Sequence, residues 1–289
     1  MDYFIHLGIL VCIYLILAQA FNIPFGVGRM FNLAHVAVYA LGAYTTALLS
    51  TEAGWSFFPC VVASMFVSGI FSLLIGGISL KLTHDYFAIG TIAFSSVVSA
   101  LLINWKSLTR GVLGIPGIPR PDIAGIDFYD NRNFLWLVII FMLLSQFVVY
   151  VVLKNSFGRS IRAQSEYEQG ASTLGYNVTA IRNAAFVVSS ALAGIAGSFY
   201  AYYINYIDPS SFSLTEMIFV LTIVVVGRPG SFWGVVFATF FLVLLPEPLR
   251  FIDIPASILG PMRQMIYALI LFSVVYWKRA TLFPVHRSI

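Results

Sequence analysis

Charge is what this sequence has least of. Lys, Arg, Asp and Glu make up 10% of its 289 residues, whereas hydrophobic residues make up 60%. So little polar surface cannot cover a water-soluble globule of this size, and the composition excludes one. Several windows supply the roughly 20 apolar residues that a helix needs to cross a bilayer. The sequence therefore predicts an all-α, polytopic membrane protein.

Motifs for catalysis, nucleotide binding and metal binding are also missing. No G-x-x-x-x-G-K-[ST] loop can cradle ATP phosphates, and neither H-E-x-x-H nor G-x-S-x-G occurs. The four histidines are scattered. Cys12 and Cys60 fall in predicted helices without CxxC spacing, which favours buried free thiols over a disulfide. We therefore predict no catalytic residue, no metal site, no cofactor bound by this chain and no nucleic-acid partner.

Ionisable residues deep inside membrane spans mark proton and ion routes, and the predicted spans contain almost none. Glu216 lies within one turn of an outer helix end, and Asp85 lies at an inner end. A proton-driven antiporter would be expected to place a carboxylate near the midplane. A channel for bare ions would need a charged or carbonyl-lined ring. The pattern favours a passage for neutral or zwitterionic solutes that is powered from elsewhere.

Apolar runs predict about nine to ten transmembrane helices in one domain over residues 1–289. The first run is too long for a signal peptide and lacks a basic start, so it is predicted to be retained. Two shorter runs, Leu214–Val226 and Phe232–Leu245, stand before the last long run. The longer runs are Tyr3–Phe21, Ala34–Ser50, Phe57–Leu80, Tyr86–Asn104, Phe134–Leu153, Asn183–Asn205 and Pro261–Trp277.

The distribution of basic residues predicts the orientation. Nine crossings put the two ends of the chain on opposite sides. With the C-terminus in the cytoplasm, ten of the 16 lysines and arginines fall on inner loops, but only three of the 12 acidic residues do. This asymmetry follows the positive-inside rule. It places the loop 154–182 in the cytoplasm and the loop 105–133 outside.

Glycine and proline interrupt two segments, "NIPFGVG" after the first run and "VGRPGSFWG" between the two short runs. A 14-residue helix rises only about 21 Å, less than a hydrocarbon core of roughly 30 Å. We therefore expect the two short runs to be broken, re-entrant half-helices that meet at a buried turn. Both segments contain Val-Gly-Arg, at Val27–Arg29 and Val226–Arg228, which leaves open whether the core is internally repeated.

Small residues recur every four positions in Asn183–Asn205, which predicts close approach of neighbouring helices on two faces of that helix. One set is Ser190, Gly194 and Ser198, and the other is Ala193, Gly197 and Ala201.

The stretch "SFGRSIRAQSEYEQGASTLGYN", Ser156–Asn177, has hardly a large aliphatic residue and predicts a short cytoplasmic helix that ends at Gly175. Arg162 and Glu166 are spaced to pair on its polar side. It is either a solvated loop helix or a docking helix that lies in a groove of a soluble protein. Its weak apolar stripe is Ala163, Tyr167, Ala171 and Leu174.

This stretch resembles the cytoplasmic loop of permease subunits in ATP-binding-cassette importers, specifically the branched-chain amino acid (LivM-type) permease family. The E-A-A-x-x-x-G pattern of that loop is matched strictly only at Ala171 and Gly175, and Glu168 is placed to take the acidic role. Asn32, Ala34 and Arg228 also replace usual family residues. Further resemblance lies in Phe31–Leu49, Leu80–Phe94, Thr109–Pro121, Ser190–Phe212 and Gly227–Gly234, which together cover nearly the whole chain in order.

The resemblance implies an importer permease subunit of the bacterial inner membrane rather than an enzyme. It would carry branched-chain or other neutral amino acids delivered by a periplasmic binding protein. It would pair with a second, related permease subunit and dock on two cytoplasmic ATPase subunits, which bind ATP and Mg. Alternatives are a permease for urea or short amides, a secondary transporter of small neutral solutes, and a membrane-bound receptor or scaffold.

The candidate site residues form three groups. The ATPase-coupling group is Tyr167, Glu168, Gln169, Gly170, Ala171, Leu174 and Gly175. The group expected to line the translocation path is Asn32, His35, Tyr44, Thr91 and Ser95. The group expected to contact the binding protein is Arg110, Arg120 and Asp122.

Overall fold

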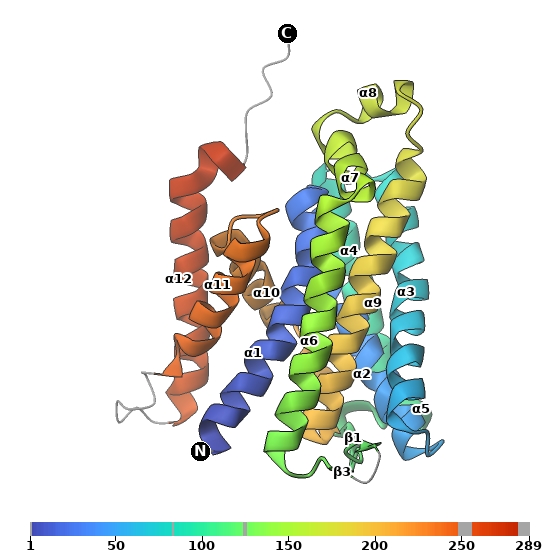
Figure 1. The fold of residues 1–289 in the computed structure, drawn as a ribbon, viewed down its shortest axis with the longest axis vertical. Helices are drawn as coiled ribbons and strands as arrows, with labels where there is room; N and C mark the ends of the chain where they lie inside the picture. The colour runs from blue at the N-terminus through green and yellow to red at the C-terminus, as the bar shows by residue number, and fades with distance from the viewer. Residues whose placement is uncertain (1, 83, 124–125, 248–255, 283–289) are drawn as a thin grey trace.

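The structure is a computed structural model that describes the whole chain except residues 1, 83, 124–125, 248–255 and 283–289. Within the described residues, five helices are long and apolar enough to cross a membrane. These helices run side by side along the long axis of the molecule (Figure 1). The predicted all-α, polytopic membrane fold is confirmed.

Each predicted apolar run forms a helix. The longer helices are α1 (Asp2–Phe21), α2 (His35–Thr51), α3 (Phe57–Lys81), α4 (His84–Asn104), α6 (Asn131–Lys154), α9 (Val178–Ile204) and α12 (Ala256–Leu282). The two short runs form α10 (Leu214–Val226) and α11 (Phe232–Leu244). Cys12 on α1 and Cys60 on α3 are buried free thiols.

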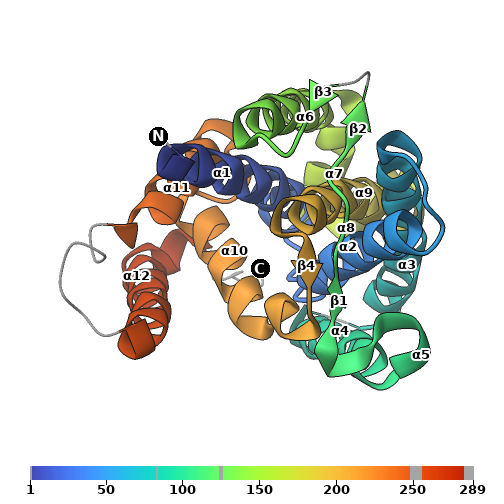
Figure 2. The ribbon, with the colours of Figure 1, turned by 90° about the horizontal axis from the view of Figure 1, so that it is seen from below.

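The helices form two groups on either side of α1. Seen from below, α10, α11 and α12 lie on one side of α1, and α2, α3, α4 and α9 lie on the other (Figure 2). Helix α1 begins at the lower end of the bundle, whereas α12 ends at the upper end (Figure 1). The start of α1 and the end of α12 therefore lie at opposite ends of the bundle (Figure 1).

Helix α9 packs against α2 and α3 at very short range. A Cβ added at Gly194 would lie 2.7 Å from the Ser64 carbonyl oxygen of α3, and one at Gly197 would lie 2.7 Å from the Ala43 amide nitrogen of α2. A Cβ at Gly42 would in turn lie 2.5 Å from the Gly194 Cα. No larger side chain fits at these crossings, so the predicted close approach is confirmed on both faces of α9.

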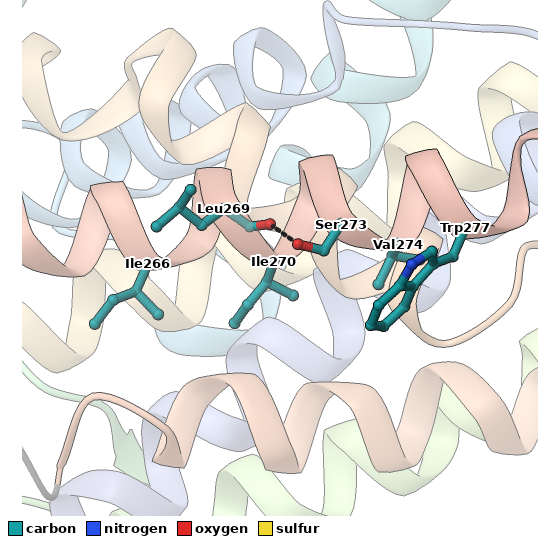
Figure 3. A pocket seen from close by; sticks show the side chains of 6 residues that line it. All are labelled: Ile266, Leu269, Ile270, Ser273, Val274 and Trp277. Atoms are coloured by element: carbon teal, nitrogen blue, oxygen red, sulfur yellow. Dashed lines mark hydrogen bonds between the residues drawn. The ribbon is translucent and has the colours of Figure 1, made fainter.

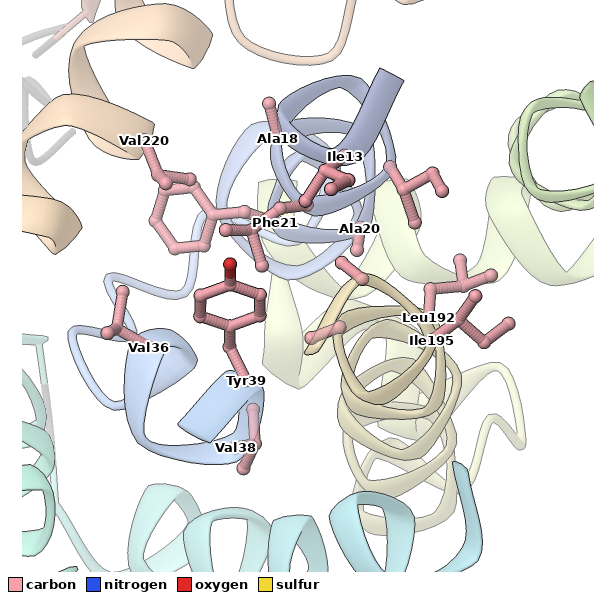
Figure 4. Close-up of a cluster of buried hydrophobic side chains, with 14 of the residues drawn as sticks. Ile13, Ala18, Ala20, Phe21, Val36, Val38, Tyr39, Leu192, Ile195 and Val220 are labelled. Carbon is pink, nitrogen blue, oxygen red and sulfur yellow. The ribbon is translucent and has the colours of Figure 1, made fainter. Parts of the chain in front are cut away.

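The centre of the bundle combines an apolar core with a small polar cluster. Side chains from α1, α2, α9 and α10 meet around Phe21 and Tyr39, both at most 1% exposed (Figure 4). Nearby, the buried Ser198 hydroxyl is 2.6 Å from both the Thr46 and Ser64 hydroxyls. These hydrogen bonds join α2, α3 and α9, which satisfies polar groups that lipid could not.

Both Gly/Pro segments break a helix, as predicted. Helix α1 continues into a π-helical turn, η1 (Asn22–Val27), and α10 meets α11 at a turn over residues 227–231. The two Val-Gly-Arg motifs end their helices in the same way. Gly28 and Gly227 stay right-handed, whereas Arg29 and Arg228 adopt positive φ values of 51° and 68°. The motifs are thus repeated in local conformation as well as in sequence.

Short structured segments cover the lower end of the bundle. After α5 (Lys106–Thr109) and the 3-10 turn η2 (Gly111–Leu113), strand β1 (Ile115–Pro116) pairs with β4 (Tyr206–Ile207), just past the end of α9. Strand β2 (Asp122–Ile123) pairs with β3 (Ile126–Asp127), and the 3-10 turn η3 (Pro209–Phe212) precedes α10. Residues 124–125 of the predicted external loop 105–133 lie outside the described residues.

Candidate coupling loop, helix-break junction and solute path

The loop at the upper end of the bundle is anchored to α6 by the helix α7 (Ser156–Glu166). Gly158 is needed because a Cβ there would lie 2.8 Å from the Leu153 carbonyl oxygen. The Arg162 guanidinium donates to that same carbonyl at 3.2 Å, which satisfies a C-terminal acceptor of α6. The predicted Arg162–Glu166 pair is therefore wrong, because Arg162 turns back to cap α6.

The loop does not form one continuous helix. Tyr167 adopts an extended conformation (φ −152°, ψ 93°) and separates α7 from α8 (Glu168–Thr173). The predicted stripe through Ala163, Tyr167, Ala171 and Leu174 is therefore wrong. Ala171 is 3% exposed and packs into its own chain, whereas Tyr167 and Leu174 are 65% and 79% exposed. The break at Tyr167 separates Ala163 from the later residues, and Leu174 lies beyond the end of α8 at Thr173.

The exposed surface of this loop is mixed in chemistry. It includes the apolar side chains of Tyr167 and Leu174, the exposed Gln169 and the half-exposed Glu168, which pairs with Arg182 of α9. Gly170 leaves room for the Tyr167 ring, because a Cβ there would overlap ring atoms. Gly175 ends the loop helix at φ +86°, the predicted left-handed stop. The structure thus brings the predicted coupling residues together, but turns Ala171 inward.

Two of the predicted path residues hold the segment between η1 and α2. The Asn32 Oδ1 accepts from the Ala34 amide at 2.9 Å. The Thr91 hydroxyl of α4 accepts from the Leu33 amide at 3.0 Å and donates to the Ala88 carbonyl at 2.8 Å. Asn32 and Thr91 are both almost completely buried. In this conformation they fix the chain entry into α2.

The other three predicted path residues do not converge on one open cavity. The His35 Nε2 lies 3.2 Å from the Leu17 carbonyl oxygen, and its Nδ1 is buried without a partner. The buried Tyr44 hydroxyl also has no partner. Ser95 lines a cavity of about 10 Å³ between α2, α4 and η3, together with Phe212. That volume holds at most a single water, so this cavity is too small for a solute.

The junction between the two helix breaks was not predicted as a site. The Asn22 Oδ1 accepts from the Gly230 amide at 2.8 Å, and the Gln19 Nε2 donates to the Phe232 carbonyl at 2.8 Å. Asn22 and Gln19 are completely buried. We refer to these contacts between residues 19–28 and 227–232 as the helix-break junction. The signal in the sequence was two amide side chains, Gln19 and Asn22, at the end of an apolar span and shortly before Pro24.

Arg120 holds the loop at the lower end to the helices instead of projecting from it. Its guanidinium donates to the Phe128 carbonyl at 3.0 Å and to the Asn131 Oδ1 at 2.8 Å. It also lies 5.2 Å from the Phe134 ring centroid. Burial lowers the pKa of Arg120 from its usual value, while the Tyr203, Tyr129 and Asp127 groups raise it. The geometry gives Arg120 a structural role. Most of its guanidinium donors are used within the chain and are not available for the predicted contact with a binding protein.

The most exposed part of the lower end is the tip of the predicted external loop. Arg110 and Asp122 are both exposed, as a contact residue must be. Arg110 has a positive φ of 58° and leads into Val112 and Leu113, which are 74% and 81% exposed. This apolar pair was not predicted as a contact site. Its signal was two large aliphatic residues between two glycines, Gly111 and Gly114.

We expect Arg120→Lys to loosen the lower loop without unfolding the bundle. Lysine keeps the charge but cannot reproduce the planar set of donors that reaches the Phe128 and Asn131 acceptors. The loss of about two hydrogen bonds from a charged group corresponds to roughly 2–4 kcal/mol of local stability. Limited proteolysis of loop 105–133 in detergent should be faster by at least tenfold, with unchanged melting of the helices. Equal proteolysis rates would contradict the role of Arg120 as a tether.

Helix α12 presents an apolar outer face. A shallow hollow of about 350 Å³ runs along it, lined by α12 residues alone (Figure 3). The Ser273 hydroxyl is bonded to the Leu269 carbonyl at 2.8 Å and so adds no free polar group. A face of this kind suits lipid chains or another apolar helix. The lining residues are Ile266, Leu269, Ile270, Ser273, Val274 and Trp277.

The fold and these sites define a polytopic α-helical membrane protein with discontinuous helices that meet in its core, an architecture typical of transporters. Comparison with known families is more specific. The chain belongs to the family described as "Branched-chain amino acid transport system / permease component", which matches residues 3–275. The predicted family is confirmed.

Among its relatives is the "High-affinity branched-chain amino acid transport system permease protein LivM" of Escherichia coli (strain K12). It is 34% identical over 269 residues, which cover 85% of this chain and 63% of that protein. LivM of Salmonella typhimurium (strain LT2) has the same identity and coverage. The "Autoinducer 2 import system permease protein LsrC" of Escherichia coli (strain K12 / DH10B) is 26% identical over 71% of this chain and 60% of that protein. This chain thus spans less than two thirds of the length of these relatives. No solved structure matches it.

Proposed function

We propose that this chain is a membrane-spanning permease subunit of an ATP-binding-cassette importer. The observation that carries the proposal is the loop of α7 and α8, which is fixed to α6 and α9 and exposes the apolar Tyr167 and Leu174. Exposed apolar side chains on a water-facing loop suit a protein partner. The sequence has no phosphate-binding loop of its own, so the energy source would be that partner.

The solute is proposed to be a branched-chain or other neutral amino acid. The LivM relatives are named for branched-chain amino acid transport. The scarcity of charge inside the spans also suits a neutral or zwitterionic solute. Urea or a short amide remains an alternative. The LsrC relative, named for import of autoinducer 2, is a reminder that related permeases carry solutes of other kinds.

The proposed assembly has two cytoplasmic ATPase subunits with ATP and Mg, a second related permease, and a periplasmic binding protein. The chain would lie in the inner membrane of a bacterium with the C-terminal end of α12 in the cytoplasm. That end lies on the same side of the bundle as α7 and α8 (Figure 1). The binding protein would contact the opposite end, where Arg110, Asp122 and the apolar pair Val112 and Leu113 are exposed.

The test is uptake of radiolabelled leucine by proteoliposomes that contain the complete proposed assembly. We expect uptake only with ATP on the ATPase side and binding protein on the other side, unaffected by an uncoupler. Uptake that persists without the ATPase subunits and collapses with an uncoupler would identify a secondary transporter. No flux of leucine, isoleucine, valine, alanine or urea under any condition would favour a receptor or scaffold.

We also expect the purified chain alone neither to bind nor to hydrolyse ATP, because no loop of consecutive backbone N–H groups with a lysine is available to hold the phosphates. Equilibrium dialysis with labelled ATP and Mg²⁺ checks this directly. Stoichiometric binding at micromolar ATP would contradict the proposal that ATP binds to separate ATPase subunits and not to the permease.

A further inference from the structure

The two helix breaks, about 200 residues apart in the chain, form one packed unit. Gly26 of η1 lies so close to the turn between α10 and α11 that a Cβ there would overlap the Gly230 amide nitrogen. Gly230 has a φ of +80°, and a Cβ there would lie 3.1 Å from the Gly26 carbonyl oxygen. Each glycine therefore leaves space for the backbone of the other break. The two breaks are therefore in direct backbone contact.

Hydrogen bonds from the side chains of α1 and η1 reinforce this contact, with Asn22 both accepting from and donating to the turn. Besides its bond to Gly230, the Asn22 Nδ2 reaches the Gln19 Oε1 at 3.3 Å and the Ser231 carbonyl oxygen at 3.5 Å. Gln19 then binds the Phe232 carbonyl. The α11 end of the turn is thus held by two completely buried amide side chains. Such a network is strong when complete and costly when one member is lost.

The same break touches the loop at the upper end of the bundle. Ile161 of α7 is completely buried, and a Cβ at Gly28 would lie 3.4 Å from its Cγ2 atom. Helix α7 is itself held to α6 by the hydrogen bond from Arg162 to the Leu153 carbonyl. It is connected to α8 by Tyr167 alone. Contacts therefore run without a gap from the exposed loop surface through Ile161 and η1 to the turn of the re-entrant hairpin.

Both partners in the junction are irregular segments. Neither is a regular helix: η1 is a π-helical turn followed by Arg29 at positive φ, and the hairpin turn contains Arg228 and Gly230 at positive φ. Non-glycine residues in this region store about 1–3 kcal/mol each and mark places where chains switch. Hinges of transporters are built from such short irregular segments.

We propose that Asn22 is a positioning residue for transport: it fixes the re-entrant hairpin α10–α11 to η1, so that movement of α7 at the ATPase is transmitted to the hairpin. This inference depends on the proposed importer function. The proposed route of coupling runs from Ile161 of α7 through η1 to the turn between α10 and α11. The hairpin turn is then the part of the permease that moves. Physical contact alone does not establish coupling, so the test must measure an interaction between sites.

The experiment is a double-mutant cycle in the complete assembly with Ile161→Ala and Asn22→Ala. The readout is the number of leucine molecules imported per ATP hydrolysed, which is independent of how much protein folds. Ile161 and Asn22 are connected in the proposed route only through η1. If the two substitutions act independently, their fold-changes in this ratio should multiply in the double variant. Ser165→Ala, on the exposed side of α7, serves as the matched control. Co-purification of the ATPase subunits is measured for every variant.

We expect each single variant to retain the ATPase subunits and to lower the import-to-hydrolysis ratio by about tenfold, with no further drop in the double variant. The control should keep the parental ratio. Ratios that multiply to about a hundredfold in the double variant, or an unchanged ratio in Asn22→Ala, would overturn the inference. A parent assembly without ATP-dependent uptake would instead refute the proposed function, so the two failures are distinguishable. If Asn22→Ala does not assemble, Gln19→Leu is tested instead. It removes the hydrogen bond from Gln19 to the Phe232 carbonyl and is expected to lower the import-to-hydrolysis ratio in the same way.

Discussion

Leu174→Asp should abolish capture of the ATPase subunits while leaving the permease folded in the membrane. Leu174 is 79% exposed at the tip of the coupling loop, so the substitution disturbs little within this chain. If Leu174 is buried at the docking surface, about 1.5–3 kcal/mol of apolar burial is lost. Placing an unpaired carboxylate there costs several kcal/mol more. Since each ~1.4 kcal/mol is tenfold in affinity, docking should weaken by a hundredfold or more.

The measurement is recovery of ATPase subunits on a tagged permease pair, with Ser165→Asp as the control. Ser165 lies on α7 and its hydroxyl bonds to the Arg162 carbonyl, so it is outside the Tyr167–Leu174 surface. Surface changes of that kind usually stay within about 0.5 kcal/mol. Parental recovery with Leu174→Asp would show that the loop tip is a solvated turn. Recovery lost equally in both variants would point to a general defect of the loop.

Ala171, the residue that matches the family pattern of this loop, is a poor place for the same test. It is 3% exposed inside its own chain. Ala171→Arg would therefore disturb α8 with or without a partner. The sequence could not reveal this, because a single helical repeat placed Ala171 and Leu174 on one face, whereas α8 begins only after the extended Tyr167 and ends at Thr173, which leaves Leu174 beyond the helix. Local amphipathicity predicts faces only where the helix is continuous.

The membrane helices were predictable because lipid imposes length and composition directly on each span. The half-helices α10 and α11 followed from the same rule, since their apolar runs were too short to cross. The close approach of α9 was also predictable, because Gly194 and Gly197 repeat at a helical spacing. These features depend on residues near one another in the chain.

The path residues and the helix-break junction depend on long-range packing instead. Thr91 hydrogen bonds Leu33 across 58 positions, and Asn22 hydrogen bonds Gly230 across 208. A single sequence gives no measure of such distances. It identified both breaks as irregular but gave no reason to place them side by side. Arg120 illustrates the same limit, because the sequence gives no sign that its acceptors, the Phe128 carbonyl and the Asn131 side chain, lie beside it.

Gly26→Ala should disrupt the helix-break junction and stop transport. A methyl group at this position would overlap both the Asn22 Oδ1 and the Gly230 amide nitrogen. The side chain of Asn22 could rotate away, but Gly230 is backbone, so the whole turn between α10 and α11 must shift. Overpacking of this kind costs about 1–3 kcal/mol, and the lost hydrogen bond adds about 1 kcal/mol. We expect leucine uptake to fall at least tenfold and the melting temperature of the purified chain to drop by several degrees.

The matched control is Gly77→Ala in α3, because a Cβ at Gly77 meets nothing within 4 Å. The same glycine-to-alanine change should stabilise that helix by up to about 1 kcal/mol, since alanine has the higher helix propensity. The pair of variants thus separates contact at the junction from the general effect of removing a glycine. Equal uptake and equal melting in both variants would mean that η1 and the hairpin turn are not held in contact. A loss confined to Gly26→Ala would place the sensitive point of the permease where its two broken helices meet.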